Sequence, residues 1–137
     1  MTRKEQTATV VGYWLEKAEA ALASARDEHT AGRKDFAVNR AYYAAFYAAS
    51  AALLAAGKRF IKHSGLRSAV HRELVKTGRL SAEWGRGFDR LFEGRQRADY
   101  LELVRFEADE VDGLIDDATG FVAEMRRLVA EHGEPSA

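Results

Sequence analysis

One short segment of the chain gathers several side chains that could act on a phosphodiester. Within six residues stand two arginines, an amide, a carboxylate and a phenol: Arg95, Gln96, Arg97, Asp99 and Tyr100. An arginine stabilises the charge of a pentavalent phosphate, and a neighbouring acid or base can move the proton of an RNA 2′-hydroxyl. Arg95 and Asp99 are also four residues apart, so an ion pair on one helix face is an equally open interpretation. Arg95, Asp99 and Tyr100 are therefore the candidate catalytic residues, and Gln96 and Arg97 are candidate binding residues.

A second candidate is Arg40, which is the only charged residue between Asp35 and Lys58. A charge in a segment that is otherwise apolar on most sides needs either a partner or a groove open to solvent. Arg40 therefore either pairs with a carboxylate of a neighbouring helix or lines a cleft that binds an anion such as a phosphate. Tyr43 lies three residues further on, and an aromatic ring can stack on an unpaired base.

The histidines do not form a recognisable metal site. They are scattered along the sequence, at His29, His63, His71 and His132. None is three or four residues from another, and there is no HExxH pattern, so we expect neither a metal nor a cofactor. His63 could supply an imidazole to a binding or catalytic site, or it could cap the helix that follows it.

The charge of the chain is balanced in total but not along its length. There are 21 basic and 21 acidic side chains among 137 residues, and no cysteine. This composition argues against a protein coated in basic surface, against a disulfide framework and against a cysteine nucleophile. Residues 57–106, however, carry 12 basic and 6 acidic side chains, whereas residues 107–137 carry 2 and 9. One local basic cleft is therefore compatible with the neutral sum.

The elements that must position these residues are helices. The single proline is at position 135, alanine is abundant, and period-two runs of β-branched residues are short. We predict an all-α, up-and-down antiparallel bundle of four to five helices. The apolar periodicity places the helices at about Thr7–Thr30, Asp35–Ala56, Gly65–Thr77, Ala82–Tyr100 and Ala108–Glu131, with residues 101–107 as a connection.

We expect one domain, with residues 1–6 disordered, residues 7–131 in the bundle and residues 132–137 in a flexible tail. The longest uncharged run, residues 41–57, is too short and too rich in alanine for a membrane span. We therefore expect a cytoplasmic protein without a membrane segment.

Three segments in this order resemble the HEPN superfamily, in its stand-alone prokaryotic branch. They are Asn39-Arg40-Ala41-Tyr42-Tyr43-Ala44-Ala45-Phe46, then Lys62-His63-Ser64-Gly65, then Arg95-Gln96-Arg97-Ala98-Asp99-Tyr100. The resemblance covers roughly residues 13–128. It implies a helical bundle that is usually a homodimer. It also implies, for many members, a metal-independent endoribonuclease site formed across the dimer.

The resemblance further implies an RNA-cleaving or RNA- or nucleotide-binding, toxin-like component of a two-gene module with a minimal nucleotidyltransferase as antitoxin. Its ribonuclease motif is an arginine followed after four to six residues by a histidine. Arg95 matches the arginine, but Asp99 and Tyr100 stand where the histidine is sought. The alternative is therefore a non-catalytic module that binds a nucleotide or a partner. In some toxins of the family, a tyrosine close after the motif is adenylylated by the partner, and Tyr100 is the candidate here by position.

Overall fold

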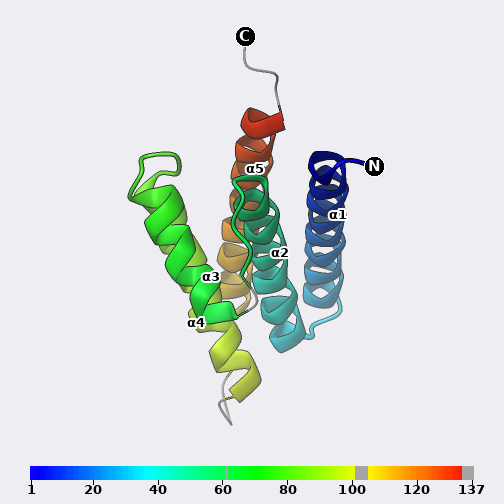
Figure 1. Cartoon of the computed structure of the whole chain (residues 1–137). Coiled ribbons are helices and arrows are strands. Elements are labelled where there is room, and N and C mark those ends of the chain that lie inside the picture. The colour runs from blue at the N-terminus through cyan, green and yellow to red at the C-terminus, as the bar shows by residue number, and fades with distance from the viewer. Residues whose placement is uncertain (61, 101–104, 134–137) are drawn as a thin grey trace.

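The computed structural model describes residues 1–60, 62–100 and 105–133. Within these residues the chain forms five α-helices and one π-helix and contains no strand, which confirms the all-α bundle (Figure 1). The elements are α1 (Arg3–Thr30), α2 (Lys34–Ala55), α3 (His63–Ala69), the π-helix η1 (Val70–Val75), α4 (Ala82–Tyr100) and α5 (Ala108–Gly133).

The N-terminal helix is longer than its apolar pattern predicts. Thr2 is the N-cap of α1, and its hydroxyl accepts a hydrogen bond from the backbone N–H of Glu5 at 3.1 Å. The same hydroxyl donates to the Glu5 carboxylate at 3.0 Å. A threonine followed three residues later by a glutamate is a helix-start signal. The helix therefore begins at Arg3, four residues before the Thr7 that the apolar pattern predicts.

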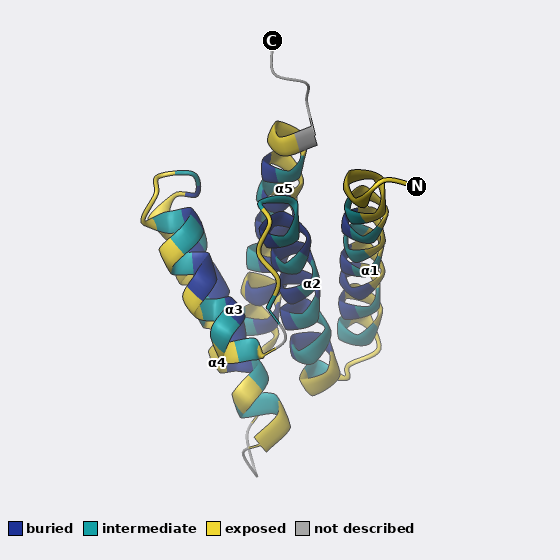
Figure 2. Ribbon diagram, viewed as in Figure 1, coloured by how far each residue is buried: buried dark blue, intermediate teal, exposed yellow. Residues whose placement is uncertain are grey.

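The second helix is the centre of the bundle, because α2 contacts α1, α3, α4 and α5. Its alanines are buried almost all round, and Figure 2 shows α2 dark blue along most of its length. Small side chains let the neighbouring helices approach closely, as the sequence predicts. The largest fully buried side chains include Tyr42 of α2, Phe88 of α4 and Phe121 of α5.

The connection after α2 runs back along the bundle, so that α3 and η1 point the same way as α2 (Figure 1). The third helix was expected over Gly65–Thr77, but it starts at His63 and becomes a π-helix at Val70. The π turn packs closely on α4, since a Cβ on Gly85 would lie 2.9 Å from Val75 Cγ2. This return path brings the start of α3 to the end of the bundle where α2 begins.

The last two helices agree closely with the prediction. α4 has the predicted bounds, and α5 starts at the predicted Ala108 and runs two residues beyond Glu131, to Gly133. Most of the predicted connection, 101–104, and most of the predicted tail, 134–137, lie outside the described residues. In the part of the chain that the structure describes, no helix is both long and apolar enough to cross a membrane.

Candidate functional site

Three elements bring polar side chains together at one end of the bundle. The last turns of α4 supply Arg95 and Asp99, the first half of α2 supplies Asn39, Arg40, Tyr42 and Tyr43, and the first residue of α3 is His63. Gly94 allows this approach, because a Cβ at that position would lie 3.2 Å from Val38 of α2 and 3.3 Å from Leu114 of α5. The missing side chain keeps the last turns of α4 close to both helices.

Arg95 is the centre of the arrangement. Its Nε donates to Asp99 Oδ2 at 3.1 Å, and its Nη2 donates to the Tyr43 hydroxyl at 3.3 Å. The guanidinium carbon lies 5.4 Å from the ring centre of Tyr42, 5.5 Å from that of Tyr43 and 5.7 Å from that of Tyr100. Only 12% of the Arg95 side chain is exposed. Arg95 is therefore a largely buried cation that is held in a fixed orientation by one carboxylate and three phenols.

Asp99 is already committed to its neighbours. Asn39 Nδ2 donates to the two carboxylate oxygens at 3.1 and 3.2 Å, and the Oδ2 atom also accepts from Arg95. This ion pair is the i,i+4 pair that the spacing predicts. The geometry fits an orienting role for Asp99, because its oxygens are occupied by donors.

Arg40 reaches the same carboxylate through an amide. Its Nη2 and Nε donate to Asn39 Oδ1 at 2.6 and 3.0 Å, while Asn39 in turn donates to Asp99. The guanidinium also lies 5.1 Å from the ring centre of Tyr43. Arg40 therefore does not pair directly with a carboxylate of the described residues, because Asn39 stands between it and Asp99. Nothing in the sequence singled out Asn39 for this relay.

His63 lies next to this group, although it is far from Arg95 in the chain. Its Nδ1 is 2.7 Å from the Tyr42 hydroxyl, and its ring stacks on Phe46 with centroids 4.4 Å apart. Burial and then the positive charge of Arg95 lower the pKa of the His63 imidazole below its ordinary value. Burial raises the pKa of the Tyr42 phenol, so that this hydroxyl stays protonated. His63 is therefore a neutral imidazole beside a guanidinium at neutral pH.

The other two predicted binding residues are not brought to this group. Arg97 Nη1 forms an ion pair with Glu110 of α5 at 2.7 Å, and its guanidinium covers the ring of Phe106 at 4.7 Å. Gln96 is exposed and lines a separate shallow hollow with Arg97 and Tyr100. Tyr100 is 68% exposed. It lines this hollow, and its ring centre also lies 5.7 Å from the Arg95 guanidinium. On a helix, Arg95 and Asp99 share one face, whereas Gln96 and Arg97 point away from it.

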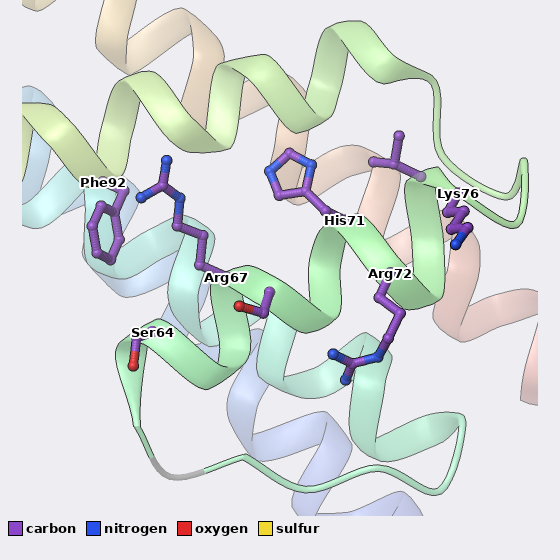
Figure 3. A pocket seen from close by; sticks show the side chains of 8 residues that line it. Ser64, Arg67, His71, Arg72, Lys76 and Phe92 are labelled. Carbon is purple, nitrogen blue, oxygen red and sulfur yellow. The ribbon is translucent and has the colours of Figure 1, made fainter.

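A second polar cluster, which sequence reasoning missed, lies beside the first. Arg67 Nε and His71 Nε2 are each 2.9 Å from Asp89 Oδ1, and the Arg67 guanidinium covers the ring of Phe92 at 4.5 Å. Arg67, His71 and Phe92 line an open hollow of about 710 Å³ together with Arg72 and Lys76. Figure 3 shows these side chains, with Arg67 and Phe92 towards one end of the group and Arg72 and Lys76 towards the other. The four-residue spacing of Arg67 and His71 was the available signal, but their partner Asp89 is on another helix.

Both clusters act on the same buried phenol. Burial raises the pKa of Tyr42, and the charges of Arg95 and Arg67 both oppose that rise. The charges of both guanidinium groups therefore act on one hydroxyl. Within the described residues, no group of three or more histidine, aspartate or glutamate side chains is placed to hold a metal ion. The arrangement suits an anion, which would be met by arginine and a neutral imidazole.

Comparisons with known proteins identify the family of the chain. Residues 11–128 match the model of the HEPN domain. A Thermotoga maritima protein named "UPF0332 protein" is 42% identical over 131 residues, which cover 96% of this chain and 97% of that protein. A Methanocaldococcus jannaschii protein named "Putative toxin" is 30% identical over 84% of this chain and 78% of its own length. A second protein with that name from the same organism is 32% identical over 69% of this chain and 70% of its own length. The chain therefore belongs to the family of proteins that carry a HEPN domain.

Proposed function

We propose that this protein is a metal-independent endoribonuclease, the toxin-like component of a two-gene module. The observation that carries the proposal is that the His63 imidazole and the Arg95 guanidinium both lie against the rings of Tyr42 and Tyr43. Cleavage of RNA without a metal needs a base for the 2′-hydroxyl proton and a cation for the charge on phosphorus. His63 fills the role for which Arg95 has no histidine in its own segment. The names of the two archaeal relatives support the toxin-like assignment.

In the proposed reaction, His63 Nε2 removes the proton from a 2′-hydroxyl as the 2′-oxygen attacks the adjacent phosphorus. The bond from phosphorus to the 5′-oxygen breaks, and that oxygen takes a proton from water. The products are a 2′,3′-cyclic phosphate and a 5′-hydroxyl. This role requires the ring proton of His63 on Nδ1, where it is donated to the Tyr42 oxygen 2.7 Å away. Arg95 stabilises the negative charge on the phosphate oxygens.

The remaining predicted residues support this centre in the proposal. Asp99 and Asn39 hold the planar guanidinium of Arg95 in one orientation, and are positioning residues rather than acids or bases. Arg40 and Tyr43 bind the RNA next to the scissile phosphate. Arg40 forms no ion pair within 4.0 Å with a carboxylate of the described residues, so its charge is available to a phosphate.

A second candidate function is binding without cleavage. It is favoured by one observation, that the residues four to six positions after Arg95 include no histidine. In that case the same guanidinium groups would hold a nucleotide or an RNA, and Tyr42 would only orient the His63 ring. The two candidates differ in whether the RNA chain is cut, and not in which residues bind it.

The test is an RNA cleavage assay in EDTA with wild type, Arg95→Ala and His63→Gln. We expect the wild type to release fragments with 2′,3′-cyclic phosphate ends and each variant to lose at least about 100-fold in rate. Arg97→Ala is the matched control, because Arg97 pairs with Glu110 away from His63. Retention of full activity in both site variants contradicts the proposal. Binding of RNA without cleavage by wild type selects the second candidate.

The proposed partner is a minimal nucleotidyltransferase that acts as antitoxin, with the protein itself a homodimer. Tyr100 is exposed and its ring lies 5.7 Å from Arg95, so an adenylate added there would bring bulk and negative charge to the guanidinium. Intact mass after co-expression with a neighbouring nucleotidyltransferase gene tests the modification. The wild type should gain adenylate increments and Tyr100→Phe should not. An unchanged wild-type mass contradicts this part of the proposal.

A further inference from the structure

A row of aromatic rings and cations extends from the Arg95 site across α2 onto α1. We call it the aromatic face, and it consists of Tyr13, Trp14 and Lys17 of α1 with Tyr43 and Tyr47 of α2. Tyr43 and Tyr47 have ring centroids 5.7 Å apart, and Tyr47 stacks on Trp14 at 5.6 Å with 27° between the planes. The rings therefore follow one another at nearly equal spacing.

The aromatic face is continuous with the Arg95 site. The Tyr43 hydroxyl accepts a hydrogen bond from Arg95 Nη2, and Arg40 lies over the Tyr43 ring. At the other end, Tyr13 is 59% exposed. The rings Trp14, Tyr43 and Tyr47 are half-buried, so they are fixed in place by the bundle while part of each remains open.

Lys17 is held on the aromatic face by rings, and no carboxylate of the described residues pairs with it. Its Nζ lies 4.6 Å from the ring centre of Tyr47, 5.1 Å from that of Trp14 and 5.6 Å from that of Tyr13. Neither Lys17 nor Arg40 forms an ion pair with an acidic side chain of the described residues. Contacts between a lysine and aromatic rings on a surface contribute little stability. The Lys17 ammonium can therefore leave the rings to pair with an anion such as a phosphate.

We infer that the aromatic face binds unpaired bases of a single-stranded RNA whose backbone passes Arg95, an inference that rests on the proposed function. Bases stack on the rings of the aromatic face, Tyr13 included, while Arg40 and Lys17 pair with the phosphates between them. Rings that alternate with unpaired cations are the complement of a chain that alternates bases with phosphates. Because every base has a π-face, this binding is tolerant of sequence. The cut site is then defined by the lack of base pairing more than by base identity.

The test uses the intrinsic fluorescence of Trp14. The chain has two tryptophans, and Trp84 packs against Gly120 of α5, so Trp84→Phe leaves Trp14 as the only reporter. The probe is a short 2′-O-methyl oligouridylate, which has no free 2′-hydroxyl and cannot be cleaved by the proposed reaction. We expect it to quench Trp14, whereas an abasic chain with the same number of phosphates should not. Equal quenching by the two chains, or none by either, overturns the inference.

Variants then separate stacking from charge. Trp14→Leu, Tyr47→Leu and the exposed Tyr13→Leu should each raise the Kd for the oligouridylate by roughly 10-fold, measured by anisotropy of a labelled chain. Lys17→Gln should lower the salt slope of log Kd by about one, and Lys4→Gln on the same helix should leave it unchanged. Unchanged Kd in the folded Tyr13→Leu and Lys17→Gln proteins overturns the inference, even if the half-buried Trp14→Leu and Tyr47→Leu variants unfold.

A second copy of the chain is the alternative occupant of the aromatic face, and the fluorescence of Trp14 detects it too. If iodide fails to quench Trp14 in the free dimer and quenches it after dilution to monomer, the face is covered by protein and the inference fails. The ribonuclease proposal is tested separately, because the 2′-O-methyl probe is bound without being cut. A protein that cleaves RNA but shows no quenching contradicts only the aromatic face. One that shows quenching without cleavage contradicts only the ribonuclease.

Discussion

The chemistry of His63 depends on a residue that is distant in sequence and adjacent in space. The Arg95 guanidinium opposes protonation of the imidazole, and burial does so more strongly. The lowered pKa keeps the ring neutral, which is the state that a general base needs at neutral pH. The same effect has a cost for folding. Because the unfolded chain binds this proton more readily, His63 destabilises the folded protein as pH falls below about 6.5 towards the lowered pKa.

The coupling between these two residues can be measured without any activity. Arg95→Gln removes the nearby charge, so the pKa of His63 should rise towards 6.5, followed by NMR titration of the His63 ring protons. Arg97→Gln should leave the pKa unchanged, because Arg97 is paired with Glu110. If cleavage is observed, the acid limb of its pH profile should move to higher pH in Arg95→Lys. This shift should be smaller than the rise in the pKa of His63 that we expect in Arg95→Gln. A His63 titration that is identical in wild type, Arg95→Gln and Arg97→Gln contradicts the proposed geometry.

Asp99 offers a second prediction at this scale, as a positioning residue. Asp99→Asn keeps the shape of the side chain but removes the charge that pairs with Arg95 at 3.1 Å. We expect kcat for RNA cleavage to fall roughly 10-fold while the pH of half-maximal activity stays with His63. Glu110→Gln, which unpairs Arg97 instead, is the control and should change neither value. Loss of the acid limb in Asp99→Asn would instead make Asp99 the base.

At the scale of the elements, hydrophobic periodicity predicted all five α-helices, because each long helix buries one apolar stripe or more. It missed two features that depend on other interactions. The start of α1 is capped by the Thr2 side chain, which lies before the first residue of the periodic apolar pattern. The π-helix packs closely on Gly85, which belongs to another helix. The glycines of α4 did indicate close packing, and Gly85, Gly87 and Gly94 are all buried.

Two glycines of α5 make the role of close packing testable. A Cβ on Gly120 would overlap the ring of Trp84, whereas a Cβ on Gly113 would have no neighbour within 4 Å. Gly120→Ala should lower the free energy of unfolding by about 1–3 kcal/mol, because the Trp84 ring must move. Gly113→Ala should raise it by up to about 1 kcal/mol through helix propensity. Denaturant unfolding measures both, and equal effects at the two positions would show that α4 and α5 pack differently.

At the scale of the whole molecule, ion pairs between helices partly neutralise the basic and acidic segments of the sequence. The basic segment around α4 pairs with the acidic helix α5, through Arg90 with Asp117 at 2.9 Å and Arg97 with Glu110 at 2.7 Å. The basic surface is thereby reduced on the α4–α5 side. Arg40 and Lys17 form no such pairs within the described residues, so their positive charge remains available beside Tyr43 and on the aromatic face.

The candidate site could be predicted from the sequence only where its contacts are local. The pair of Arg95 and Asp99 follows from a spacing of four on a helix, and the structure has it. The approach of His63 to Arg95 depends on the return path after α2, and the relay through Asn39 depends on how α2 meets α4. Neither is encoded in any short pattern. The separation of Arg97 from Arg95 follows from helix geometry and could have been predicted.

This arrangement leads to a prediction about the dimer that the family resemblance implies. If Arg95 and His63 act as the structure has them, one protomer contains both groups. In a site shared across the dimer, by contrast, the arginine of one chain works with the imidazole of the other. Mixing Arg95→Ala with His63→Gln distinguishes the two cases, because every chain in the mixture lacks one group. We expect no recovery of RNA cleavage in EDTA after subunit exchange, which is verified by mass spectrometry of the mixed dimers. Recovery to about a quarter or half of the wild-type rate would mean that each site uses residues of two chains, and that the closeness of His63 and Arg95 within one chain serves packing and not catalysis.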